Sequence, residues 1–248
     1  MGIVTASEFR FYREKIFSLG LPITKEVILT EQFLLEKDEH KQLEIYYTPF
    51  DYLNEEASVV LVGITPGLHQ MKKAYQAVVE SWSIGLEDEE ILLEVKKKAS
   101  FEGTMRRNLV TMLDDLGLAE HLGLTSTLEL FGSASHLVYT TSILPHAVFF
   151  RQQNYNGSRP PILKTERLFH YVNQYFLQDI LRIRDPLIIP LGVNVNRVIE
   201  YLINQNLLNI KNVIAGFPHP SGGNGHRQKQ FRKNKEEMKK KIWEYFNK

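Results

Sequence analysis

The 248-residue sequence contains no cysteine, which excludes disulfide bonds, thiolate nucleophiles, cysteine-ligated zinc and iron–sulfur clusters. It has no apolar run approaching the roughly 20 residues that a membrane-spanning helix needs. The N-terminus lacks the basic flank and apolar core of a signal peptide. The eight histidines show no zinc-ligand spacing with one another or with acids. We therefore expect an unprocessed cytoplasmic protein with no membrane partner, no metal and no cofactor.

The composition favours one large folded domain with a basic end. Apolar residues make up 43% of the chain and charged residues 24%, enough to bury a substantial core. We expect a single domain over residues 1–248, in which residues 1–57 form an accessory helix and β-hairpin. The net charge of +1 conceals nine Lys or Arg against three acids after His226. Apolar residues there recur at helical spacing, which predicts a basic helix over 227–247 whose cationic face is either merely solvated or attracted to phosphates.

Strand-length apolar runs alternate with helical segments from residue 59 onward. This alternation is typical of a parallel sheet with both faces covered, so we expect an α/β protein with three α/β/α layers around a mostly parallel four-stranded sheet. The predicted strands are Val59–Val62, Leu137–Ile143, Leu187–Leu191 and Asn212–Ala215. The predicted helices are about Gln70–Leu93, Thr104–Leu116, Glu166–Leu181 and Val195–Asn204.

The N-terminal segment shows a different pattern. A helix is expected over about Glu8–Leu19, and the β-rich runs Val27–Leu35 and Gln42–Tyr47 flank a polar turn at Glu36–His40. These runs predict a hairpin. The irregular stretch Arg151–Pro161 is expected to be a surface loop near the edge of the sheet where ligands bind.

Two polar turns directly follow predicted strands. The first is Gly63-Ile64-Thr65-Pro66-Gly67, and the second is His219-Pro220-Ser221-Gly222-Gly223-Asn224. Ligands bind at the carboxyl edge of an open α/β sheet, where helix N-termini and free backbone N–H groups converge. We therefore expect both turns to belong to one site.

Five segments, in order, resemble motifs of the uracil-DNA glycosylase superfamily. The first turn is similar to the family's Gly-x-(Asp/Asn/Ala)-Pro-(Tyr/Gly) motif, and His219-Pro220-Ser221 is similar to its His-Pro-Ser motif. Between them, the resemblance rests on Ser100–Thr104 with the helix that follows, on the strand ending at Ser142, and on Ile188–Gly192. It covers residues 59–232 and implies a uracil-DNA glycosylase-like fold.

The resemblance implies hydrolysis of the N-glycosidic bond of uracil or another damaged base in DNA, as in base excision repair. His219 would donate a hydrogen bond to the base carbonyl where negative charge develops, and Thr65 would hold the attacking water. Phe101 would stack on the flipped base, and Ser142 would read its edge. The substrate-binding set it implies is Gly63, Ile64, Pro66, Gly67, Phe101, Ser142, Pro220 and Ser221.

Three positions depart from the family pattern. Thr65 stands where many members have a residue that activates water, and a threonine hydroxyl cannot act as a general base near neutral pH. Ile64 occupies the place where one branch has a glutamate, and Ser142 replaces the usual asparagine.

His69, just past the first turn, is either an inward-facing titratable group or a surface histidine. Phe101 is likewise open to interpretation as an ordinary core residue.

The second turn lacks the apolar wedge that duplex-acting members insert into the base stack. Its glycines expose backbone N–H groups, which suits phosphate contact or single-stranded DNA better than invasion of a duplex. The predicted nucleic-acid-binding residues are Gly222, Gly223, Asn224, His226 and Arg227. The alternative interpretation of this loop is a flexible connection between a strand and a helix.

Three functions remain open from the sequence. One is a DNA glycosylase with an atypical Thr65. The second is a non-catalytic nucleic-acid or nucleotide-binding protein that keeps the pocket but lacks the catalytic carboxylate. The third is a hydrolase or transferase acting on small nucleosides at the same sheet edge.

Overall fold

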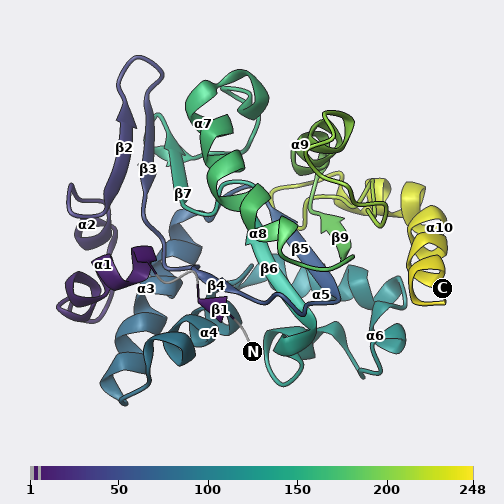
Figure 1. Ribbon diagram of the computed structural model, residues 1–248, viewed down its shortest axis with the longest axis horizontal. Coiled ribbons are helices and arrows are strands. Elements are labelled where there is room, and N and C mark those ends of the chain that lie inside the picture. The colour runs from purple at the N-terminus through teal and green to yellow at the C-terminus, as the bar shows by residue number, and fades with distance from the viewer. Residues whose placement is uncertain (1–2, 5–6, 248) are drawn as a thin grey trace.

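The computed structural model describes residues 3–4 and 7–247, so residues 1–2 and 5–6 of the predicted accessory segment, and residue 248, lie outside the described part. Figure 1 shows a mixed α/β architecture with the hairpin β2–β3 at one end and the C-terminal helix α10 at the other. The strands are β1 (Ile3–Val4), β2 (Leu34–Asp38), β3 (Leu43–Tyr46), β4 (Tyr52–Leu53), β5 (Val59–Gly63), β6 (Val138–Ser142), β7 (Ala147–Phe150), β8 (Gln153–Asn154) and β9 (Leu187–Pro190).

The helices cover both faces of the parallel sheet β6-β5-β9. Because side chains alternate along a strand, Val60 and Val62 face one side, where α7, α8 and α9 pack, and Val59 and Leu61 face α5 and α10 on the other. The longer helices are α1 (Ser7–Phe17), α3 (Leu68–Ser83), α4 (Asp88–Ala99), α5 (Thr104–Asp115), α9 (Val193–Asn204) and α10 (Arg227–Phe246). Shorter ones are α2 (Lys25–Ile28), α6 (Leu118–His121), α7 (Glu166–Tyr171) and α8 (Leu177–Leu181), the last two joined by a π-helical segment, Val172–Phe176.

The prediction of a fourth parallel strand at Asn212–Ala215 is wrong. This segment makes one isolated bridge, Val213 with Ile188, formed by Ile188 N–H to Asn212 O at 2.8 Å and Ile214 N–H to Ile188 O at 2.9 Å. The next donor on β9 would be residue 190, which is a proline without an N–H. The ladder therefore stops after one residue.

The predicted N-terminal hairpin forms, but its first strand is misplaced. Residues Lys25–Ile28 form the short helix α2, because Ile28 is fully buried against the helical cluster around α3, and β2 begins only at Leu34. Tertiary packing here overrides the β-preference of the sequence. The hairpin also joins β7 and β8 in a four-stranded antiparallel sheet, β2-β3-β7-β8, which the sequence did not predict.

The helix predicted over Gln70–Leu93 is two helices. Gly85, with φ +81°, ends α3 in the left-handed conformation that glycine adopts without strain. The Glu90 carboxylate then accepts from the Glu87 N–H at 3.0 Å and starts α4. The other predicted helices and strands from residue 59 onward are confirmed within a few residues. Among the described residues, no helix is long and apolar enough to span a membrane.

Candidate functional site

The first turn follows β5 at the carboxyl edge of the parallel sheet, where Gly63 pairs with Ser142 of β6. A Cβ atom on Gly63 would lie 3.0 Å from Cε1 of Phe101 and 3.2 Å from Oγ of Ser142. Phe101 has φ +52°, a left-handed conformation that is uncommon for an aromatic residue and is typical of functional sites. The turn, the predicted stacking residue and the predicted base-reading residue therefore lie together.

Thr65 connects this turn to the second sheet. Its hydroxyl donates to the carbonyl of His146 at 2.7 Å and accepts from the N–H of Val148 at 3.1 Å. The single hydroxyl proton is therefore in use, and only one lone pair is left to accept a hydrogen bond from water.

His219 packs against the backbone of Gly192. That glycine has φ +103°, and a Cβ on it would lie 3.0 Å from Cβ of His219. The Ser221 N–H donates to Nδ1 of His219 at 3.4 Å, so the neutral ring carries its proton on Nε2. Burial lowers the pKa of His219 below its ordinary value of 6.5, which favours that neutral form at pH 7.

The loop after His219 is held by hydrogen bonds from both sides. Asn224 Nδ2 donates to the His219 carbonyl at 3.1 Å, and Arg227 donates to the Ser221 carbonyl at 2.8 Å. Asn108 of α5 donates to the Pro220 carbonyl at 2.8 Å. The carbonyl oxygens of His219, Pro220 and Ser221 are thereby occupied, while a Cβ on Gly223 would meet no atom within 4 Å.

A cavity of about 740 Å³ lies between the two turns and brings much of the predicted site together. The predicted residues lining it are Ile64, Thr65, Gly67, His219, Ser221 and Asn224. His69, Glu102 and Lys233 of α10 also line it. Asn154 and Asn156 line it too, so the segment over residues 151–161 lies near this edge as expected, but it is not wholly irregular, because Gln153–Asn154 form β8 and pair with β7. Within the described part of the chain, six predicted residues line neither this cavity nor the pocket beside it: Gly63, Pro220, Gly222, Gly223, His226 and Arg227.

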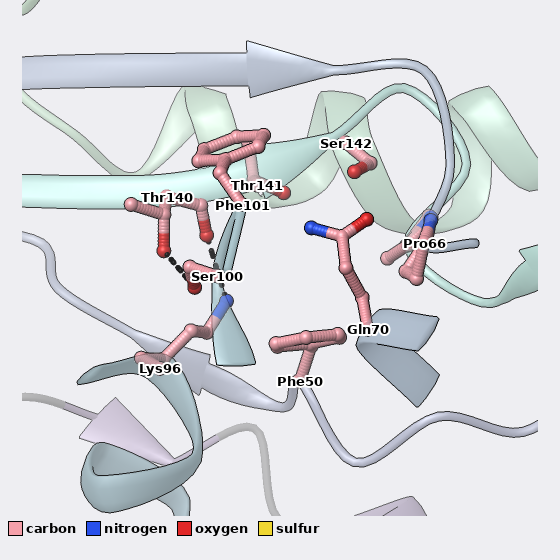
Figure 2. Close-up of a pocket in the computed structure, with 10 residues that line it drawn as sticks. Phe50, Pro66, Gln70, Lys96, Ser100, Phe101, Thr140, Thr141 and Ser142 are labelled. Atoms are coloured by element: carbon pink, nitrogen blue, oxygen red, sulfur yellow. Dashed lines mark hydrogen bonds between the residues drawn. The ribbon is translucent and has the colours of Figure 1, made fainter. Parts of the chain in front are cut away.

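Phe101, Ser142 and Pro66 line an adjoining inner pocket, shown in Figure 2. Its volume is about 20 Å³, room for about one water molecule. Gln70 of α3 lines both spaces, and in Figure 2 its amide points into the inner pocket, beside Ser142. Gln70 therefore stands at the junction between the inner pocket and the large cavity.

Lys96 of α4 lies at the back of the inner pocket. Its ammonium donates to the Thr140 carbonyl at 2.8 Å and lies 5.5 Å from the centre of the Phe50 ring (Figure 2). Burial lowers the pKa of Lys96 to about 8, although the carboxyls of Asp179 and Asp51 oppose that change. The pocket thus combines aromatic walls with a buried cation.

The sequence analysis missed Glu102, Gln70, Lys96 and Phe50. Lys96 had a usable signal, because it stands at helical spacing between Leu92 and Ala99 on the apolar face of its helix. A lysine at such a position indicates either a buried cation or a segment that does not form an amphipathic helix. Glu102 and Gln70 carry no such signal.

The sequence model of the Uracil DNA glycosylase superfamily matches residues 50–247. The chain is also similar to "Uncharacterized protein YoxB" of Bacillus subtilis (strain 168), with 41% identity over 242 residues, which are 97% of this chain and 94% of the relative. No solved structure matches the chain significantly. The family match includes both turns and every residue described above for the two adjoining spaces.

Proposed function

Because the chain belongs to the uracil DNA glycosylase superfamily, we propose that it hydrolyses the N-glycosidic bond between deoxyribose and uracil or another damaged base in DNA. The observation that carries the proposal is the state of His219 beside the large cavity. Burial favours its neutral form, its Nδ1 accepts from a backbone N–H, and its Nε2–H is then the proton that it can offer. A departing base accumulates negative charge on its carbonyl oxygen. An N–H donor held in a fixed position stabilises that charge by a hydrogen bond, without proton transfer.

The surrounding residues support recognition of a flipped base. Phe101 offers an aromatic face, and the Ser142 hydroxyl and the Gln70 amide offer hydrogen bonds beside it. The inner pocket holds only about one water with Gln70 in its present position. Binding a whole base at Phe101 therefore requires the lining of this pocket to rearrange, and Gln70 is the lining residue that stands at the junction with the large cavity.

The second turn and α10 support DNA as the partner. Lys233 lines the large cavity, and its neighbours on the exposed face of α10 include Lys229 and Arg232. The glycine-rich turn offers no wedge, so we propose single-stranded DNA as the better substrate.

A second candidate is a binding protein that has lost the reaction. Thr65 favours it, because its hydroxyl is committed to His146 and Val148 and the first turn contains no carboxylate. The two candidates differ in whether an abasic product forms, since both predict binding to DNA.

The test is incubation of the protein with labelled single-stranded and duplex oligonucleotides that carry uracil, hypoxanthine or a mismatch, followed by alkaline cleavage of abasic sites. Free deoxynucleosides form a further arm, which tests for a nucleoside hydrolase. We expect abasic product from at least one DNA substrate, and His219→Ala should lower its rate at least tenfold. His136→Ala, an exposed histidine outside the cavity, is the matched control.

Salt-sensitive binding to DNA without any abasic product would contradict the glycosylase and favour the binding protein. An unchanged rate in His219→Ala would remove that residue from the mechanism.

A further inference from the structure

Glu102 and His69 meet at the wall of the large cavity. Glu102 lies in the turn between α4 and α5, directly after Phe101, and His69 lies in the first turn of α3. The Nε2 atom of His69 is in direct contact with a carboxylate oxygen of Glu102. Two segments that are far apart in sequence thus hold an imidazole and a carboxylate together beside the cavity that Thr65 and His219 also line.

Hydrolysis of the glycosidic bond needs an acceptor for a proton of the attacking water. Thr65 cannot supply it, because its hydroxyl is a weak base and its proton already goes to His146. Among the described residues that line the cavity, Glu102 is the only one with a carboxylate. The group that the first turn lacks is therefore present in the same cavity on another element.

We propose that Glu102 is the general base for the attacking water and that His69 is a positioning residue that holds its carboxylate. This inference rests on the proposed glycosylase function. In the step, the bond between C1′ and the base nitrogen breaks and its electrons leave with the base. The water oxygen bonds to C1′, and one water proton passes to Glu102. The base anion accepts a hydrogen bond from His219 and then a proton from solvent.

The charges around Glu102 suit this role. Three cationic or protonatable groups act electrostatically on it: His69 and Lys73 from α3, and Arg106 from α5. The hydrogen bond with His69 is the main cause that lowers the pKa of Glu102, so the carboxylate is ionised at neutral pH. A weak base is sufficient here, because the sugar at the transition state resembles an oxocarbenium ion, which water attacks readily.

The experiment compares single-turnover cleavage rates of the full chain and its variants on the best oligonucleotide from the substrate panel. Glu102→Gln keeps the size and a hydrogen-bonding partner for His69 but cannot take a proton, so we expect a rate about 100-fold lower. His69→Gln should lower the rate about tenfold, and Glu102→Asp should recover part of the loss. Glu80→Gln removes an ion-paired carboxylate outside the cavity and should change the rate less than twofold.

Binding and pH dependence separate a chemical role from a structural one. We expect Glu102→Gln and His69→Gln to bind a non-hydrolysable substrate analogue within twofold of the wild type. Both should unfold at the same temperature as the wild type. The wild-type rate should fall as the pH drops through the pKa of Glu102, and this acidic limb should be absent in Glu102→Gln.

The outcomes are distinguishable. Wild-type protein that is inactive on the whole panel would overturn both the glycosylase function and this inference. An active wild type with Glu102→Gln within threefold of it would overturn this inference alone. Loss of analogue binding in Glu102→Gln, in step with the rate, would also overturn it, because the carboxylate would then act in binding.

Discussion

Replacing the buried Lys96 with methionine should stabilise the protein, although the lysine makes a good hydrogen bond. Lys96 is only 8% exposed, and its ammonium has the Thr140 carbonyl as its hydrogen-bond acceptor at 2.8 Å. Methionine has a similar length and carries no charge, so it fills the same space between Phe50 and Tyr139 without the desolvation cost. We expect the free energy of unfolding at pH 7 to rise by about 1–2 kcal/mol.

The magnitude follows from the pKa. Burial lowers the pKa of Lys96 from 10.5 to about 8, and each pKa unit corresponds to about 1.4 kcal/mol, so keeping the charge inside at pH 7 costs about 3 kcal/mol. The variant avoids that cost but also loses the charged hydrogen bond to Thr140, which lowers its free energy of unfolding by about 1.5 kcal/mol. The carboxyls of Asp51 and Asp179 also lose a nearby cation, but the pKa of Asp51 is already raised to about 6, so it can respond by taking up a proton.

The pH dependence of stability is a second measurement that tests whether Lys96→Met stabilises the protein for this reason. Between about pH 8 and pH 10.5 the unfolded chain keeps the Lys96 proton and the folded chain releases it, so wild-type stability gains from this residue as the pH rises. Lys96→Met has no such gain. Its advantage should therefore be largest near pH 7 and should disappear by about pH 10.

The assay is urea unfolding followed by circular dichroism at pH 7 and pH 9.5. Lys97→Met is the matched control, because Lys97 is the next residue on the same helix but is only partly buried and forms an ion pair with Glu94. That change should stay within about 0.5 kcal/mol. A Lys96→Met variant that is less stable than the wild type at pH 7, or whose difference from it does not change with pH, would refute the reasoning.

Two further predictions concern the cavity. Thr65→Val should lower the free energy of unfolding by about 2–3 kcal/mol in urea titrations, because the His146 carbonyl and the Val148 N–H both lose their partner. Loss of cleavage with unchanged stability would contradict this structural role and would mean that Thr65 acts only by holding the attacking water. Lys233→Ala should weaken binding to single-stranded DNA and reduce the slope of log affinity against log salt by about 0.7, measured by fluorescence anisotropy, whereas Lys240→Ala at the far end of α10 should leave the slope unchanged.

The fold could be predicted where local signals and burial agree. The strands β5, β6 and β9 are continuous apolar runs, and the helices between them have clear apolar faces, so their order and approximate bounds follow from the sequence. The failures have tertiary causes. Pro190 limits the partner of Asn212–Ala215, although that segment itself is β-rich, and the pairing of β3 with β7 joins residues about 100 positions apart. No local pattern contains such pairings.

The site was predictable to the extent that turns after strands meet at one sheet edge. The rule places these residues at one edge of the sheet but does not place them in one pocket: Thr65 and His219 line the large cavity, whereas Phe101 and Ser142 line the smaller pocket beside it. What the sequence could not supply is which side chains outside the strands and the two turns reach the cavity. Glu102 reaches the cavity only because α5 packs against the sheet and α3 brings His69 beside it, and these relations depend on contacts distant in sequence.

The first turn serves mainly as a frame. Backbone pairing of β5 with β6 continues past the strands, because Ile143 N–H donates to Gly63 O and Leu144 N–H donates to Ile64 O, both at 2.9 Å. Thr65 then fixes the turn to His146, directly before β7, and to Val148 within β7. A turn held this firmly positions Phe101 and the cavity wall whether or not it carries a carboxylate itself. Under the proposed mechanism, the proton acceptor can therefore come from a different element without any change in the frame, and the atypical Thr65 is compatible with catalysis.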